Sequence, residues 1–147
     1  MDEHIYKSHN KTLLLYHLVF PAKYRKKVFS EVVEVSLKNI CLEIGKCYEI
    51  HFVEIGLEDD HVHFLVQSIP VLPVFRIVTI IKSITAREIF HLHKDVKKSL
   101  WGGSLWTSGY YANTVGQYAS TEVIKKYVAN QGREYKKIHS AQLLFDF

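Results

Sequence analysis

The segment DDHVHFLVQ, residues 59–67, places two histidines at alternate positions at the start of an apolar run. Successive residues of a β-strand point to opposite faces of the sheet. One face of this strand therefore carries three apolar side chains, Val62, Phe64 and Val66. The other face brings His61 and His63 side by side, which is how a strand offers part of a metal site. The pair alone does not separate metal ligands from buried core histidines.

The sequence on either side of this segment switches between strand and helix patterns. Four apolar or aromatic-rich runs predict strands, at residues 12–20, 48–57, 61–67 and 104–116. Ser30, a favoured N-cap residue, predicts the start of a helix that runs to about Cys47. A second helix begins near Pro73 and carries an apolar stripe at helical spacing: Val74, Ile77, Val78, Ile81 and Ile84.

The predicted order of elements is β-α-β-β-α-β, followed by one more helix. This order favours a ferredoxin-like α/β sandwich, an α+β fold in which two helices cover one face of an antiparallel sheet. We expect a single domain over residues 1–147, with its core in residues 12–131 and a loosely attached tail at 133–147. If the helices pack on the apolar face of the segment, His61 and His63 lie on the open face. Paired imidazoles on an open face favour a functional site over a core role.

Length and composition are those of an ordinary globular protein. The chain has 147 residues, of which 48% are hydrophobic and 23% are charged, with a net charge of +4. One domain of this size can bury a substantial core, and the basic balance favours a polyanionic partner. No apolar run reaches the length of a membrane span, and the polar N-terminus does not form a signal peptide. Cys41 and Cys47 match no zinc or redox spacing, which predicts reduced thiols in the cytoplasm.

Residues 120–131 predict the last helix, in which Tyr127 and Gln131 are one turn apart on the same face. Apolar residues share that face, so a core role is one interpretation of the tyrosine. A buried carboxamide needs hydrogen-bond partners, which makes Gln131 less suited to a core. In the alternative interpretation, the Gln131 oxygen completes a two-histidine metal site and Tyr127 delivers a nucleophile to it.

Four segments resemble, in order and spacing, the small single-tyrosine HUH transposases of the insertion-sequence 200/605 family: YHLVFPAKYRKKV, DDHVHFLVQ, LWTSGYYANTVG and VIKKYVANQ. The resemblance covers about residues 12–131. It implies that His61 and His63 are metal ligands, that Gln131 is the third ligand and that Tyr127 is the nucleophile. The implied activity is cleavage and rejoining of single-stranded DNA at hairpin-bearing ends of a mobile element, through a 5′-phosphotyrosine intermediate.

The resemblance also implies a divalent metal, Mg²⁺ or Mn²⁺, and a homodimer in which each active site is shared between subunits. Imidazole suits later transition metals better than Mg²⁺, so the sequence leaves the physiological metal open. The predicted strand at 104–116 supports a dimer, because an exposed edge strand is a liability unless something covers it or pairs with it. We expect a cytoplasmic protein of a prokaryotic cell that associates with the nucleoid when bound to DNA.

Basic and aromatic residues provide candidate contacts with single-stranded DNA. Seven basic residues are candidates for binding phosphates: Lys23, Arg25, Lys26, Lys27, Arg76, Lys82 and Arg87. Four aromatic residues are candidates for base stacking: Tyr24, Trp101, Trp106 and Tyr110. Any one of the basic side chains also fits an ordinary solvated surface, so the prediction concerns the group.

Two departures from the family pattern leave open whether this copy is active. Gly116-Gln117 stands where the family commonly has a glycine pair before the last helix, and the turn EDD at 58–60 replaces a more usual proline-containing turn.

Two alternatives to an active transposase stay open. One is a binding module without chemistry, which would favour exposed aromatics over histidines on the central strands. The other is a domesticated relative that recognises hairpin repeats without mobilising its own gene.

Overall fold

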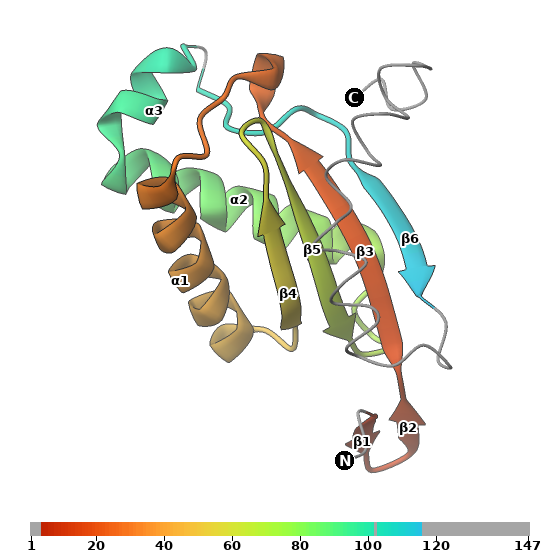
Figure 1. The fold of residues 1–147 in the computed structure, drawn as a ribbon. Coiled ribbons are helices and arrows are strands. Elements are labelled where there is room, and N and C mark those ends of the chain that lie inside the picture. The colour runs from red at the N-terminus through yellow and green to blue at the C-terminus, as the bar shows by residue number, and fades with distance from the viewer. Residues whose placement is uncertain (1–3, 102, 116–147) are drawn as a thin grey trace.

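The computed structural model describes residues 4–101 and 103–115, and Figure 1 shows their arrangement. The elements in chain order are β1 (Ile5–Lys7), β2 (Asn10–Thr12), β3 (Leu14–Pro21), the 3-10 turn η1 (Lys23–Arg25), α1 (Glu31–Cys47), β4 (His51–Leu57), β5 (His61–Ser68), α2 (Val74–Leu92), α3 (Lys94–Ser99) and β6 (Tyr111–Val115). The helix predicted at 120–131 and the tail predicted at 133–147 lie outside the described residues.

Within the described residues, the main sheet has four strands in the order β4-β5-β3-β6, and every neighbouring pair is antiparallel. The units β3–α1–β4 and β5–α2–β6 are both split, because another strand lies between the two strands of each unit. In Figure 1, α2 crosses behind the sheet and α1 lies beside β4. This topology confirms the predicted ferredoxin-like α+β fold. β6 is an edge strand, as the sequence predicted for this part of the chain.

Helix α1 begins and ends where the sequence predicts. The Ser30 hydroxyl accepts a hydrogen bond from the backbone N–H of Val33 at 3.4 Å, and two acidic residues in the first turn complement the helix dipole. The helix ends at Cys47, and its buried stripe is Val33, Leu37, Ile40, Cys41 and Ile44. This stripe packs against the sheet, so the amphipathic pattern determines which side of α1 faces the core.

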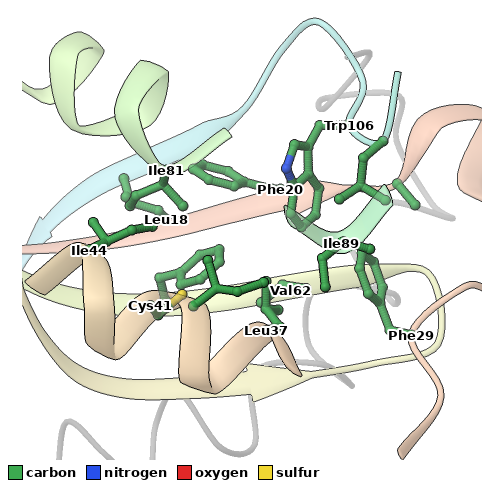
Figure 2. Close-up of a cluster of buried hydrophobic side chains, with 14 of the residues drawn as sticks. Leu18, Phe20, Phe29, Leu37, Cys41, Ile44, Val62, Ile81, Ile89 and Trp106 are labelled. Atoms are coloured by element: carbon green, nitrogen blue, oxygen red, sulfur yellow. The ribbon is translucent and has the colours of Figure 1, made fainter. Parts of the chain in front are cut away.

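The hydrophobic core lies between the two long helices and one face of the sheet. Figure 2 shows Leu18 and Phe20 of β3 among side chains from β5, α1 and α2. The buried residues of α2 are Ile77, Val78, Ile80, Ile81, Thr85 and Ile89. Two members of the predicted stripe, Val74 and Ile84, are only partly buried at its margin. On the opposite face of the sheet, Leu15 and Leu65 form a second, smaller cluster.

The predicted fourth strand at 104–116 is too long, because β6 covers only Tyr111–Val115. The preceding residues form a loop that Trp106 anchors in the core. Its indole N–H donates to the Thr85 hydroxyl at 3.0 Å, and its ring packs against Phe20 and Phe29. A strand would place alternate residues on opposite faces, whereas this loop directs the large ring inward. Trp106 forms an isolated bridge with Ala22, and the backbone N–H of Thr107 donates to the Pro21 carbonyl of β3 at 3.0 Å.

Short local elements escaped the sequence prediction. The hairpin of β1 and β2 extends beyond the end of β3 in Figure 1, and helix α3 follows α2 directly. The first and second predicted strands begin later than expected, at Leu14 and His51. Within the described residues, none of the helices is long and apolar enough to cross a membrane.

Candidate active site around paired histidines

His61 and His63 lie at the start of β5, on the face of the sheet opposite α1 and α2. Alternation along β5 places Val62, Phe64 and Val66 in the helix-covered core, as predicted. The rings of His61 and His63 meet edge to face, with centroids 4.9 Å apart. The sequence therefore identified both the pairing of these imidazoles and the side of the sheet on which they lie.

The expectation that this face is open was wrong, because the side chains of His61 and His63 are 0% and 1% exposed. Neighbouring strands contribute to this burial. The His17 ring of β3 stacks on His63 with centroids 5.5 Å apart, and the Tyr111 ring of β6 lies edge-on to His17 at 6.0 Å. We call the side of the sheet that carries His17, His61, His63 and Tyr111 the histidine face.

Burial keeps the imidazoles of His17 and His63 neutral. Desolvation lowers the pKa of His63 to about 3, and the charges of His61 and His17 contribute to the same direction. Desolvation likewise lowers the pKa of His17 to about 4. Both rings are therefore uncharged at neutral pH, and a neutral imidazole is the form that ligates a metal.

Asp60 forms a hydrogen bond with Nδ1 of His61. One carboxylate oxygen, Oδ1, lies 2.7 Å from His61 Nδ1, and the other accepts a 3.2 Å bond from Arg25 Nε. A second guanidinium nitrogen of Arg25 also lies 3.2 Å from Oδ2. Burial raises the pKa of Asp60, but the His61 hydrogen bond and the Arg25 charge outweigh it and hold the pKa well below its ordinary range. Asp60 is thus a carboxylate.

Arg25 reaches Asp60 from a strained backbone. Tyr24 and Arg25 have φ values of 59° and 52°, in the left-handed region that non-glycine residues rarely enter. Such conformations cost on the order of 1–3 kcal/mol each and persist where the surroundings impose them. Here the backbone N–H of Ala22 donates to the Asp60 carbonyl at 2.8 Å, and the N–H of Arg25 donates to the Ala22 carbonyl at 2.9 Å.

The sequence analysis missed His17, which contacts the site from the central strand. Its Nε2 lies 3.2 Å from His63 Nδ1. Periodicity assigns His17 to one face of β3, but the strand pairing decides which residues it meets. In the observed register, Val19 pairs with His63 and His17 pairs with Leu65, which places the two histidines diagonally on one face. A polar residue inside the apolar run 12–20 was the signal that could have pointed to it.

The described side chains provide part of a metal site. Nδ1 of His61 and Nδ1 of His63 are both engaged, so Nε2 is the nitrogen of each ring suited to ligation. Within residues 4–101 and 103–115, no cluster of three or more His, Cys, Asp or Glu side chains is suited to hold a metal. Two adjacent imidazoles fit a divalent metal that takes further ligands elsewhere. The predicted third ligand Gln131 and nucleophile Tyr127 lie outside the described residues.

The basic loop after β3 lies beside this pair of histidines. Lys26 and Lys27 are exposed, while Lys23 is half-buried with its ammonium 5.4 Å from the centre of the Tyr24 ring. Arg25 is bound to Asp60 as described above. The loop is joined to the turn before β5 by the hydrogen bond from Ala22 to Asp60. The exposed cations Lys26 and Lys27 therefore lie in the loop whose other residues bind Asp60.

The basic residues of α2 differ in their surroundings. Arg76 and Arg87 are exposed. Lys82 is half-buried, and its ammonium donates to the carbonyls of Thr107 and Gly109 at 2.8 and 2.7 Å. Desolvation lowers the pKa of Lys82 to about 8. Lys82 therefore ties α2 to the loop before β6, and phosphate contact is still a prediction for all three residues.

Three of the four aromatic candidates for base stacking are exposed, namely Tyr24, Trp101 and Tyr110. The fourth prediction was wrong: Trp106 is 5% exposed and belongs to the hydrophobic core. An indole that packs against two phenylalanines and donates its N–H to Thr85 cannot stack on a base without unfolding the loop. Sequence composition alone does not distinguish a buried tryptophan from an exposed one.

The fold and the site are those of a ferredoxin-like domain with paired histidines at the start of an inner strand, and comparison with known proteins identifies its family. Residues 10–131 match the family described as Transposase IS200 like. The ISDra2 transposase TnpA of Deinococcus radiodurans is 32% identical over 118 residues, which are 80% of this chain and 84% of the relative. The chain belongs to the IS200-like transposase family.

Further similarities agree with this assignment. The transposase for insertion sequence element IS200 of Salmonella typhimurium is 26% identical over 129 residues, covering 88% of this chain and 84% of the relative. A crystal structure from Deinococcus radiodurans R1, provisionally described as a transposase, superposes with a TM-score of 0.73 at 26% identity. That superposition covers 90% of this chain and 95% of the solved one.

Proposed function

We propose that this protein cleaves and rejoins single-stranded DNA by transesterification at the hairpin-bearing ends of a mobile element. The observation that carries the proposal is the buried pair His61 and His63, with ring centroids 4.9 Å apart, in a chain of the IS200-like transposase family. In this proposal Tyr127 is the nucleophile, and Gln131 joins the two histidines as a ligand of Mg²⁺ or Mn²⁺. When bound, the metal supplies Lewis-acid stabilisation of the charge that develops on the scissile phosphate.

The reaction conserves the phosphodiester. The Tyr127 oxygen forms a bond to phosphorus, the bond from phosphorus to the 3′ oxygen breaks, and that oxygen leaves as a 3′-hydroxyl after taking up a proton. The 5′ end stays on the protein as a phosphotyrosine. Attack by another 3′-hydroxyl reverses the step and rejoins DNA, so no ATP is consumed. Exposed Lys26 and Lys27 beside the site would neutralise backbone phosphates of the substrate.

A covalent-adduct assay tests this proposal. Single-stranded element ends are labelled at either the 5′ or the 3′ terminus and incubated with protein and Mg²⁺ or Mn²⁺. A 5′-phosphotyrosine transfers only the 3′ label to the protein, while the 5′ label leaves on a free strand. Tyr127→Phe removes only the hydroxyl and is expected to form no adduct but to retain hairpin binding. Adduct formation by Tyr127→Phe would contradict the assignment of the nucleophile, and hairpin binding without an adduct in wild type would favour a binding module.

We also propose a homodimer in which His61 and His63 of one subunit act with Tyr127 of the other. The edge position of β6 supports this proposal, because pairing across a symmetry axis would cover that edge. Mixing His63→Ala subunits with Tyr127→Phe subunits tests it. A shared site leaves one intact site in each mixed dimer, so cleavage should return. Subunit exchange has to be demonstrated separately. If the subunits exchange and cleavage still does not return, the tyrosine and the histidines of each site lie on the same subunit.

A further inference from the structure

We infer that two separate positioning groups hold the paired histidines by Nδ1, so that both present Nε2 to the metal. Asp60, braced by Arg25, orients His61. His17 orients His63. The inference rests on the proposed metal site and extends it to three residues that are not ligands. None of the three is assigned contact with the metal; each acts through an imidazole.

The contact of His61 with Asp60 fixes one tautomer of the His61 ring. A carboxylate can only accept hydrogen bonds, so the 2.7 Å contact of Asp60 Oδ1 with His61 Nδ1 requires the proton of that ring to sit on Nδ1. The lone pair of a neutral ring then lies on Nε2. Hydrogen bonding of the outer nitrogen to a carboxylate is the usual way in which proteins orient a metal-binding histidine and raise its basicity.

Arg25 restrains Asp60 on its other side. The guanidinium contacts Oδ2 through two nitrogens, each at 3.2 Å, which leaves Oδ1 directed at His61. The backbone of Asp60 is also fixed by the hydrogen bond from Ala22. Arg25, which carries this guanidinium, and the preceding Tyr24 both have left-handed backbones. Strain of this kind concentrates at functional sites, where the surrounding structure maintains it.

The residue that positions His63 is His17, which lies on the neighbouring strand β3. His63 Nδ1 lies 3.2 Å from His17 Nε2, and the two rings stack within 13° of parallel. For His63 to ligate through Nε2, its Nδ1 proton must be donated to His17, which then carries its own proton on Nδ1. The Tyr111 ring packs edge-on against His17 and limits its rotation. The opposite donor direction would leave a proton on His63 Nε2 and block ligation.

Nitrogen NMR of the metal-free protein tests the tautomers without any activity measurement. Long-range ¹⁵N–¹H correlation distinguishes Nδ1–H from Nε2–H rings, and spectra of His61→Ala and His63→Ala assign the signals. We expect Nδ1–H for both His61 and His63. In Asp60→Ala, His61 should shift toward the Nε2–H form that predominates in free imidazole side chains. An Nε2–H signal for His61 in the wild type would overturn the inference.

Metal affinity gives a second readout, measured by electron paramagnetic resonance of Mn²⁺ titrated into each variant. Loss of such an outer partner typically weakens metal affinity about 10- to 100-fold. We expect losses in this range for Asp60→Ala, Arg25→Gln and His17→Phe. His17→Gln should recover part of the affinity, because its carboxamide oxygen can accept from His63 Nδ1. Recovery would separate hydrogen bonding from ring packing.

Lys38→Gln is the matched control, because it breaks a 2.8 Å ion pair with Glu34 on the exposed side of α1. It should leave Mn²⁺ affinity and both tautomers unchanged. Variants at Asp60, Arg25 and His17 that bind Mn²⁺ as tightly as the wild type would overturn the inference while sparing the proposed function. If the wild type binds no Mn²⁺, the metal dependence in the proposed function is contradicted. The NMR measurement of the two tautomers then tests on its own how the histidines are positioned.

Discussion

Phe64 and His63 are neighbours on β5 and are almost equally buried, at 0% and 1% exposed, yet they lie in opposite environments. Phe64 packs against the rings of Phe20 and Phe52, with centroids 5.0 and 5.9 Å away. His63 instead lies between His17 and His61. Burial therefore does not mark the core in this protein; the polarity of the buried atoms does. Burying polar groups costs free energy, so a buried face rich in imidazoles indicates a role other than stability.

Replacing His63 by leucine is expected to have a larger effect on function than replacing Phe64. Leucine fills a similar volume but cannot bind a metal, so the protein should stay folded while the ligand is lost. Loss of one metal ligand removes several kcal/mol of transition-state stabilisation, which lowers the cleavage rate by at least about 10³-fold. Single-turnover cleavage and thermal melting measure the two quantities. Normal cleavage, or a protein that no longer folds, would show that His63 is a core histidine.

Replacing Phe64 by alanine should have the opposite result: it should lower stability and leave the metal site intact. The side chain is fully buried among other rings, and truncation of such a residue typically lowers the free energy of unfolding by about 3–5 kcal/mol. Urea unfolding measures the loss. Molecules that stay folded should bind Mn²⁺ with unchanged affinity, because Phe64 faces away from the histidines. A large fall in metal affinity at full folding would mean that the two faces are coupled through β5.

The two faces were predicted from the sequence with different success. Strict alternation from Val62 to Val66 and the helical spacing of Leu37, Cys41 and Ile44 gave the fold and the composition of the core. These signals are local, because they depend only on the period of each element. The Ser30 cap is local as well. For this reason the order of strands and helices could be derived without knowing any tertiary contact.

What the sequence did not predict depends on contacts between distant segments. His17 joins the site only because β3 and β5 pair in one register, which brings positions 46 residues apart together. The burial of His61 and His63 depends on the side chains that cover them. The inward turn of Trp106 depends on Thr85 across the core. Each of these features is tertiary, and periodicity carries no information about it.

The Lys82 ammonium contacts both polar and apolar groups. Replacing Lys82 is expected to have a smaller effect than replacing His63 or Phe64. Its ammonium donates to the carbonyls of Thr107 and Gly109 and lies 5.5 Å from the centre of the Phe20 ring. We expect Lys82→Met to lower the free energy of unfolding by about 1 kcal/mol at pH 7, the usual net value of such hydrogen bonds. Arg87→Met on the exposed side of the same helix is the matched control and should have less effect.

The pH dependence of this difference tests why the pKa of Lys82 is lowered. Desolvation brings the pKa from 10.5 to about 8 in the folded protein. Above pH 8 the folded protein has lost this proton while the unfolded chain still holds it, so stability rises with pH up to about the unfolded value. The advantage of the wild type over Lys82→Met should therefore grow from pH 8 to pH 10.5, as followed by urea unfolding at each pH. An advantage that shrinks over this range would mean that the two carbonyls stabilise the charged ammonium more than burial destabilises it.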